Sequence, residues 1–287
     1  MKRFRVLWIF VLAAVTVVFV LYLGVQALSA QDGGPQFTVD DGALEVSVQD
    51  GPEALLRGIT AQDGMDGDVT GSILVEKLSD FYDGNRRLVT YAAFDSDDNV
   101  SKASREIVYT DYSSPRFSLT HALRWKTGEN LNLTQLVQAS DALDGDLSGK
   151  VKVRTEATIS SRTAGVYPIS FSVTNSAGDT QTLDTQLEIY DPQTNEAALE
   201  LTDYLVYWEG EDIDYRSYLQ SVTAGGVKYS FQPGSQTGTS AGGGSLSRSD
   251  ISIRSQLDTS QAGVYPVYLT YQDGTYQGTS LLLVVVE

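Results

Sequence analysis

Two patterns of apolar and polar residues divide the chain. Residues 6–25, VLWIFVLAAVTVVFVLYLGV, carry no charge, whereas short runs of alternating apolar and polar residues fill the chain from residue 37 onward. At about 1.5 Å per residue, a helix over the uncharged segment is roughly 30 Å long, the thickness of the hydrocarbon layer of a membrane. Alternation with a period of two is typical of a strand with one buried face. The sequence therefore predicts one N-terminal helix followed by an all-β region.

The uncharged segment is expected to be a transmembrane signal anchor. The basic residues of MKRFR precede it and acidic residues follow it. By the positive-inside rule, residues 1–5 then lie in the cytoplasm and residues 26–287 are extracellular. We expect a single-pass protein of the cell membrane that contacts the membrane through residues 6–25. A short flexible linker is expected over residues 26–36.

A cleaved secretory signal is the alternative for the same segment. Ala27, Ser29 and Ala30 are small residues of the kind that permit cleavage. The apolar core of a signal peptide usually has about 7–15 residues, which is shorter than this segment. No ionisable group interrupts the segment, which argues against a transport or proton-relay role.

The β region divides into three units of similar length. Turn signals recur about every 8–12 residues, which is the spacing of the strands in a β-sandwich. We expect tandem Ig-like β-sandwich domains over residues 37–111, 112–192 and 193–287. The Gly- and Ser-rich stretch 233–247 is expected to be a flexible surface loop of the third, diverged unit.

Two short motifs recur at matching places in the units. DGD occurs at 66–68 and at 144–146, and its central glycine suits a turn with positive φ. GVYP occurs at 165–168 and at 263–266, where proline can begin a strand because the amide that it lacks is not needed there. We expect the tyrosine ring to pack on the core and its hydroxyl to bond to the backbone, as in the tyrosine corner of Ig-type sandwiches.

These motifs resemble the Ig-like repeats of bacterial surface proteins, which also occur in some insecticidal crystal toxins. The second unit fits the repeat over nearly its whole length, at Asp141, residues 144–146, residues 150–153, Gly165, Tyr167 and residues 175–179. The first unit fits at Asp63, residues 66–68 and residues 95–99, and the third at residues 262–271. The first unit departs from the repeat at Arg87, where the corner tyrosine is expected. The resemblance implies Ig-like sandwiches on a bacterial surface that serve as spacers or binding modules, with no catalytic residue.

Charge and cysteine content narrow the class of partner. The chain has 287 residues, no cysteine and a net charge of −17. Three basic residues precede the uncharged segment, so the other 17 basic and 37 acidic residues give the rest of the chain a net charge of −20. A region this acidic repels nucleic acid and anionic lipid, so no nucleic acid is expected as a partner. Without cysteine, the domains must be stable without disulfides.

The acidic turns have two interpretations. Aspartate oxygens are ligands that Ca²⁺ prefers, but their spacing here differs from that of the EF-hand loop. Aspartates in turns also accept hydrogen bonds from backbone amides, which explains the same residues without an ion. No cofactor is expected. The residues kept as calcium candidates are Asp63, Asp66, Asp68, Asp141, Asp144 and Asp146.

Catalytic chemistry finds little support among the residues. His121 is the only histidine, and no G-x-S-x-G motif accompanies it. The lack of cysteine excludes a Cys–His dyad. Nothing singles out two of the 37 acidic residues as a glycosidase pair. We therefore expect that the protein is not an enzyme.

The start of the third unit is unusually aromatic. Its Tyr204, Tyr207, Trp208, Tyr215 and Tyr218 either belong to the core and a half-buried face or form a patch that contacts carbohydrate or protein. The function expected is that of a membrane-anchored bacterial surface protein that displays Ig-like modules for structural spacing or adhesion. The alternative is an accessory envelope protein that recognises an extracellular protein or a cell-wall glycan through the third unit.

Overall fold

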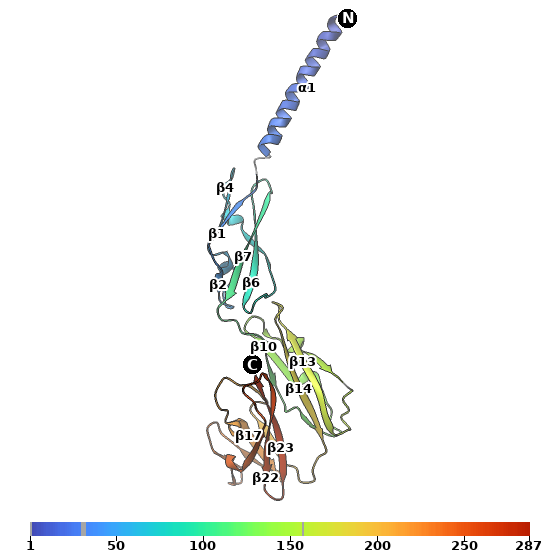
Figure 1. Cartoon of the computed structure of the whole chain (residues 1–287), viewed down its shortest axis with the longest axis vertical. Helices are drawn as coiled ribbons and strands as arrows, with labels where there is room; N and C mark the ends of the chain where they lie inside the picture. The colour runs from blue at the N-terminus through green and yellow to red at the C-terminus, as the bar shows by residue number, and fades with distance from the viewer. Residues whose placement is uncertain (1, 30–32, 157) are drawn as a thin grey trace. The chain divides into compact units, whose positions relative to one another are not determined.

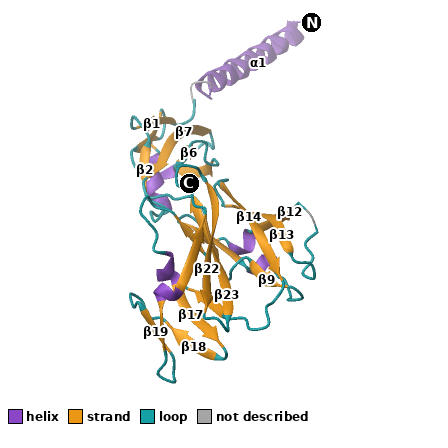
Figure 2. Ribbon diagram, turned by 60° about the horizontal axis from the view of Figure 1, so that its bottom comes forward, coloured by secondary structure: helices purple, strands orange, loops and turns teal. Residues whose placement is uncertain are grey.

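The structure is a computed structural model that describes residues 2–29, 33–156 and 158–287. A single long helix, α1 (Lys2–Ser29), covers the uncharged segment, and strands and loops make up most of the rest (Figure 2). Among the described residues, no helix is long and apolar enough to cross a membrane, so the structure lends no support to the span expected over residues 6–25.

The chain forms two compact units, Met1–Tyr112, which includes α1, and Ser113–Glu287. The first contains one β-sandwich and the second contains two, which confirms the expected architecture of tandem sandwiches. Figure 1 shows the long β13–β14 hairpin of the second sandwich and the β22–β23 hairpin of the third. Within the described ranges, short 3₁₀ helices connect some strands: η1 (Pro52–Leu56), η2 (Thr70–Ser72), η3 (Leu133–Gln135), η4 (Ser148–Lys150), η5 (Tyr215–Tyr218) and η6 (Arg248–Asp250).

The first sandwich packs the sheet β1-β3-β4 against the sheet β2-β7-β6-β5. Its strands are β1 (Gln36–Val39), β2 (Leu44–Val46), β3 (Ile59–Asp63), β4 (Gly67–Asp68), β5 (Leu74–Leu78), β6 (Arg86–Phe94) and β7 (Val100–Tyr109). Strand β2 pairs in parallel with β7, whereas the other pairs are antiparallel.

The second sandwich repeats this plan with the sheets β11-β10-β8 and β12-β13-β14-β9. Its strands are β8 (Arg116–Leu119), β9 (Arg124–Lys126), β10 (Val137–Asp141), β11 (Gly145–Asp146), β12 (Lys152–Thr155), β13 (Gly165–Thr174) and β14 (Thr180–Tyr190). Here β9 pairs in parallel with β14, as β2 does with β7.

The third sandwich has the sheets β15-β17-β18-β19-β20 and β16-β23-β22-β21. Its strands are β15 (Ala198–Leu201), β16 (Leu205–Tyr207), β17 (Leu219–Ala224), β18 (Val227–Ser230), β19 (Thr237–Thr239), β20 (Ser245–Ser247), β21 (Ile251–Ser255), β22 (Gly263–Gln272) and β23 (Gln277–Val286). The parallel pair is β16 with β23, so the same strand order recurs in all three sandwiches, with β19 and β20 as an addition in the third.

The alternating sequence pattern directs one face of each strand into a core. On β13, Ile169, Phe171 and Val173 are buried, while the serines between them are partly exposed. On β6, Tyr91 and Ala93 are buried in the same way. Each large side chain buried in this manner stabilises the fold by roughly 1.5–3 kcal/mol relative to leaving it exposed.

Strand β23 departs from this alternation, and its SLLLVVV run explains how the second and third sandwiches join. Leu282 and Val284 belong to the core of the third sandwich. Leu281 and Leu283, whose side chains alternate with theirs, belong to the core cluster of the second. A strand covered on both faces reads as a continuous apolar run rather than an alternating one.

The hydroxyl bonds expected of the tyrosine corners are confirmed in the second and third sandwiches, and the expected packing on the core is seen for Tyr167. The Tyr167 hydroxyl donates to the carbonyl oxygen of Thr163 at 2.8 Å, and that of Tyr265 donates to Gln261 at 3.0 Å. In the first sandwich Arg87 is buried at the matching place, and its Nε donates to the carbonyl oxygen of Ser79 at 2.6 Å. A guanidinium therefore provides the backbone bond that a tyrosine hydroxyl provides in the other two sandwiches.

The stretch 233–247 differs from the flexible loop that was expected. Strand β19 pairs with β20 inside it, and β18 pairs with β19, so it extends a sheet of the third sandwich. Arg248, which is 3% exposed, donates from Nε to the carbonyl oxygen of Ser235 at 2.7 Å. Gly238 lies so close to Phe231 that a Cβ there would be 2.8 Å from the ring. The glycine permits close packing rather than a loose loop.

Candidate functional site

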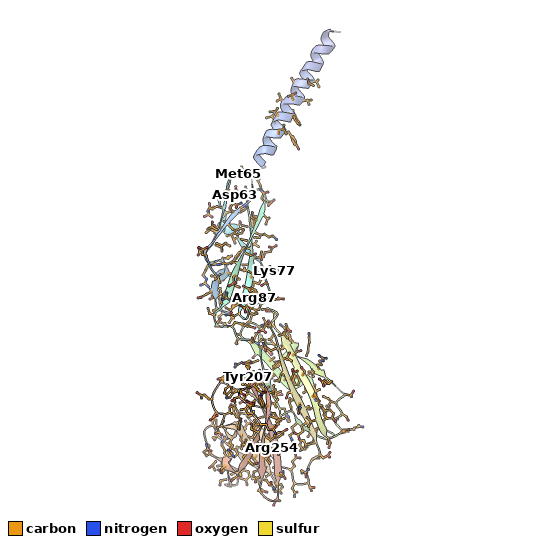
Figure 3. The ribbon with its side chains drawn as sticks, in the orientation of Figure 1. Asp63, Met65, Lys77, Arg87, Tyr207 and Arg254 are labelled. Carbon is orange, nitrogen blue, oxygen red and sulfur yellow. The ribbon has the colours of Figure 1, made fainter. Side chains whose placement is uncertain are left out.

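The acidic turn of the first sandwich is held together by its own hydrogen bonds. Oδ1 of Asp63 accepts from the amides of Met65 at 2.8 Å and Asp66 at 2.9 Å. Asp66 in turn accepts from the amide and the hydroxyl of Ser96, in the turn between β6 and β7. Asp63 and Met65 lie together at one end of this sandwich, away from Arg87 (Figure 3). The turn thus ties two strand connections to each other.

The second sandwich repeats this arrangement. Asp144 accepts from the amide of Ser176 at 2.7 Å and from its hydroxyl at 2.6 Å. Asp141 accepts from the amide of Asp144 and, at 2.8 Å, from the side-chain nitrogen of Asn175. Asp68 and Asp146 each accept from the amide two residues further along the chain.

The carboxylates kept as calcium candidates therefore act as acceptors for turn amides and hydroxyls. In the part of the chain that the structure describes, no three His, Cys, Asp or Glu side chains converge in a way that could hold a metal ion. These hydrogen bonds are the ones expected of aspartates that accept from backbone amides in turns. A cation that bound to these carboxylates would have to displace several of them.

The third sandwich, which lacks the acidic turn, uses an aromatic ring in its place. Gly225 has a φ of +57°, and a Cβ there would lie 2.7 Å from the ring of Tyr276. Tyr276 follows Asp273, whose Oδ1 accepts from the amides of Thr275 and Tyr276. Ring packing on a glycine thus joins the two turns that carboxylate–serine bonds join in the other sandwiches.

Hydrogen bonding in these turns predicts sensitivity to acid. Amide bonds, chiefly from Asp66 and Met65, lower the pKa of Asp63, and the amide of Tyr276 does most to lower the pKa of Asp273. A carboxyl with a lowered folded pKa stabilises the fold above its unfolded pKa of about 3.9, and this contribution is lost as the pH falls through the folded value. We expect the melting temperature to vary little between about pH 5 and 7 and to fall below about pH 4.

The variant Asp63→Asn provides the check on this expectation, since its amide oxygen can still accept but has no titrating carboxyl. Its melting temperature should decline less steeply with acid than that of the wild type, when both are followed by circular dichroism. An equally steep decline in both proteins would assign the acid sensitivity to other groups.

The aromatic residues at the start of the third unit do not form one exposed patch. All five are half-buried. Trp208, Tyr215 and Tyr218 pack against the core of the third sandwich, and the Trp208 Nε1 donates to the carbonyl oxygen of Glu211 at 3.0 Å. Tyr204 packs against the cores of both the second and the third sandwich, and Tyr207 packs against the core cluster of the second.

Tyr207 occupies one end of the contact between these sandwiches, which we call the junction. Its hydroxyl accepts from the amide of Phe117 at 2.9 Å, and the Arg116 guanidinium lies 4.7 Å from its ring centroid. Arg116 also pairs with Glu209 and Glu287, each at 3.5 Å. Burial does most to raise the pKa of Tyr207, so the hydroxyl stays protonated at neutral pH.

Arg124 organises the other end of the junction. Its guanidinium lies 3.5 Å from the ring centroid of Tyr190, and its Nη1 donates to the carbonyl oxygen of Thr279 at 3.2 Å. Its Nε is 3.3 Å from Oε1 of Glu188, but that nitrogen and Oε2 of Glu188 are buried without a hydrogen bond among the described residues. The Tyr190 hydroxyl donates to Glu196, and burial with this bond raises its pKa.

Two hollows border Arg124, Tyr190 and Glu196. One, of about 640 Å³, is lined further by Val166, Glu188 and Gln277. The other, of about 590 Å³, is lined by residues of both sandwiches and includes Tyr204. We call this second hollow the junction cleft. Tyr204 is therefore the predicted aromatic residue that reaches a concave site shared by two domains, where ligand sites are often found.

Sequence reasoning missed the junction, although one signal for it was present. The run of apolar residues on β23 is too continuous for a strand with one solvent face, so it indicates a second buried face. Only the folded structure shows which residues cover that face. It also shows that Arg124 pairs with Glu188 and that Lys126 pairs with Glu196.

No protein-family model and no curated protein matches the chain. A solved structure of CBM51-2 in complex with GlcNAc and INT domains of Clostridium perfringens ZmpB is 22% identical, with a TM-score of 0.22, and the match covers 52% of this chain and 26% of that one. A Bacteroides thetaiotaomicron lipoprotein is 11% identical over 59% of this chain and 98% of its own, with a TM-score of 0.22. The EC21-23 fragment of human CDH23 is 14% identical, with a TM-score of 0.21, and the match covers 88% of this chain and 99% of that one.

The chain thus spans about a quarter of the length of the first of these structures. Scores and identities at this level say nothing about ligand or partner. The assignment of tandem Ig- or cadherin-like sandwiches rests on the sheet order that recurs three times in the described chain.

Proposed function

We propose that this chain is an envelope display protein, held at the membrane by its N-terminal segment and acting as a spacer that presents a stiff pair of sandwiches outside the cell. The observation that carries the proposal is the double burial of β23, because Leu282 and Leu283 fill the cores of two different sandwiches. Two domains that share a strand in this way resist bending, whereas small polar interdomain contacts permit it.

The polar contacts of the junction support the same role. Arg116 and Arg124 each bond across it, at opposite ends of the shared face. A contact clamped at both ends restricts rotation as well as separation. Extracellular placement is part of the proposal and is supported by the uncharged segment 6–25 with the basic residues before it. Bacterial origin is also part of the proposal and is supported by the resemblance of the repeated motifs to the Ig-like repeats of bacterial surface proteins.

The proposal does not include a catalytic role, because the surroundings of His121 are not those of a general base. Its Nδ1 lies 2.9 Å from the carbonyl oxygen of Ala122, and among the described residues no carboxylate or hydroxyl bonds to the ring. A histidine that acts as a general base is oriented by a partner and lies within reach of a nucleophile. Recognition of a glycan or protein through the third sandwich is the second candidate, favoured by the position of Tyr204 in the junction cleft.

Membrane fractionation of a bacterium that expresses the chain tests the anchor. The full-length protein should stay with the membrane after carbonate extraction, and protease added to intact cells should degrade the β region. Val15→Arg places a charge in the middle of the uncharged segment, at a cost of roughly 2.5–3.5 kcal/mol for insertion, and should weaken retention. Full-length protein in the soluble cytoplasm would refute the proposal, and a mature chain that starts after Ala30 would replace it with secretion.

A further inference from the structure

The junction cleft brings together side chains that are far apart in the sequence. The second sandwich contributes His121, Lys126 and Glu129, and the third contributes Glu200, Tyr204 and Gln220. Because the junction holds both sandwiches in one compact unit, these groups keep a constant spacing. A site built from two rigid walls loses little conformational entropy when a ligand binds.

Aromatic rings form one wall of the cleft. The ring of His121 is exposed and nearly parallel to that of Tyr204, at 15° with the centroids 5.9 Å apart. The ring of Trp125 contacts that of His121, with the two ring centroids 4.8 Å apart. Since the Ala122 carbonyl can only accept, the neutral histidine carries its proton on Nδ1 and leaves Nε2 as an acceptor toward solvent.

The charges that line the cleft are nearly balanced. Two lining residues are basic (Arg124 and Lys126) and three are acidic (Glu129, Glu196 and Glu200). Lys126 pairs with Glu196 at 3.0 Å, and Glu200 pairs with Lys228 at 2.7 Å. In a chain of net charge −17, a lining with two basic and three acidic residues is nearly neutral, so the cleft lacks the field that would select a strongly charged ligand.

Polar groups that can still bond lie beside the aromatic wall. Gln220 is exposed on β17, and its amide makes no hydrogen bond to any described residue. The amide offers both donors and an acceptor, and each paired carboxylate retains further acceptor positions. The cleft therefore combines apolar ring faces with donors and acceptors at low net charge.

We propose that the junction cleft binds a neutral saccharide. Sugar rings present C–H faces that pack on aromatic rings, and hydroxyls that both donate and accept. A basic peptide would find only one cleft carboxylate without an ion pair among the described residues, Glu129, because Glu196 and Glu200 are already paired. A phosphorylated ligand would find no cation left for it, because Lys126 is paired with Glu196 and Arg124 with Glu188. This site rests on the second candidate function, recognition through the third sandwich, and gives it a ligand class and a place. It depends on neither the spacing role nor the anchor, so its failure would leave both of those standing.

The single histidine makes the test specific. Full-length protein labelled at histidine, purified in a detergent without a sugar headgroup, should show one imidazole signal, and that signal reports on the cleft. Titration with a glucose trisaccharide and an N-acetylglucosamine trisaccharide should shift the signal in a saturable way with at least one of them. Trilysine at the same concentration should leave it in place.

Gln220→Ala and its control distinguish the site from a general effect. Loss of the Gln220 amide should weaken saccharide binding roughly fivefold, as expected for one hydrogen bond. Gln62→Ala, an exposed glutamine on β3 of the first sandwich, should leave the affinity unchanged. The proposal is overturned by the absence of a saturable shift with either sugar, by an equal shift with trilysine, or by Gln220→Ala binding as the wild type does.

Discussion

Leu283→Ala will uncouple the second and third sandwiches, whereas Leu282→Ala will destabilise the third sandwich itself. The two leucines are adjacent on β23, and both are almost completely buried, at 2% and 0% exposure. Each truncation should lower the free energy of unfolding by about 2–5 kcal/mol, as cavities at buried leucines do. The loss falls in different places because Leu283 packs in the second core cluster and Leu282 in the third.

Hydrogen exchange and denaturant titration separate the two outcomes. In Leu283→Ala, the single transition of the second compact unit should split in two, and both sandwiches should keep slow exchange in their central strands. In Leu282→Ala, exchange should accelerate across β21 and β22, which pair with each other and, through β22, with β23. Val227→Ala, at a side chain that is 44% exposed, serves as the control. Identical patterns in both variants would show that β23 serves one core only.

The alternation of apolar and polar residues was sufficient to predict tandem sandwiches, because each strand with one solvent face carries its own signal. The corner tyrosines were predictable for the same reason, since Tyr167 bonds to a carbonyl only four residues away. The replacement of the corner tyrosine by Arg87 in the first sandwich was not predictable, because Arg87 bonds to Ser79 across a longer loop that lies outside the motif. Local chemistry can be read from a motif, but a replacement that reaches further along the chain requires the fold.

The candidate site was harder to predict than the fold. Tyr204 was identified as a binding residue from the aromatic content of its unit, yet His121 and Gln220, which lie on the same cleft, belong to segments almost a hundred residues apart in numbering. Their meeting depends on how β23 docks on the second sandwich. An alternating pattern indicates that one face of a strand is buried, but it does not indicate which other element covers that face.

The prediction of a flexible loop over residues 233–247, the insertion in the third sandwich, was wrong because it relied on composition alone. Glycine and serine between residues 233 and 247 are typical of a mobile loop, but the residue that orders the segment lies just beyond it. Arg248 bonds through Nε to Ser235, and through Nη1 to the carbonyl oxygens of Arg216 and Leu219. Its guanidinium also lies 4.7 Å from the ring centroid of Phe231. One buried cation thus connects the insertion to the sheet that it extends.

Arg248→Ala is therefore expected to release the β19–β20 hairpin and to destabilise the third sandwich by about 3 kcal/mol or more. The physical reason is that the carbonyls of Ser235, Arg216 and Leu219 lose their donor, and a buried acceptor without a partner costs about 1–3 kcal/mol. Arg248→Lys should recover only part of the loss, because one ammonium cannot reproduce the planar fork of donors. Denaturant titration measures the stability, and amide exchange at 237–239 and 245–247 measures the release of the hairpin.

Arg254→Ala is the matched control, since Arg254 is exposed and stacks on Tyr268 at 4.4 Å without buried bonds among the described residues. It should change the unfolding free energy by less than about 0.5 kcal/mol, as surface substitutions usually do. If Arg248→Ala leaves exchange in the hairpin as slow as in the wild type, the packing of Gly238 on Phe231 is sufficient to order the insertion. The difference between the two arginines would then lie in the stability of β17 and η5, whose carbonyls Arg248 binds, rather than in the hairpin.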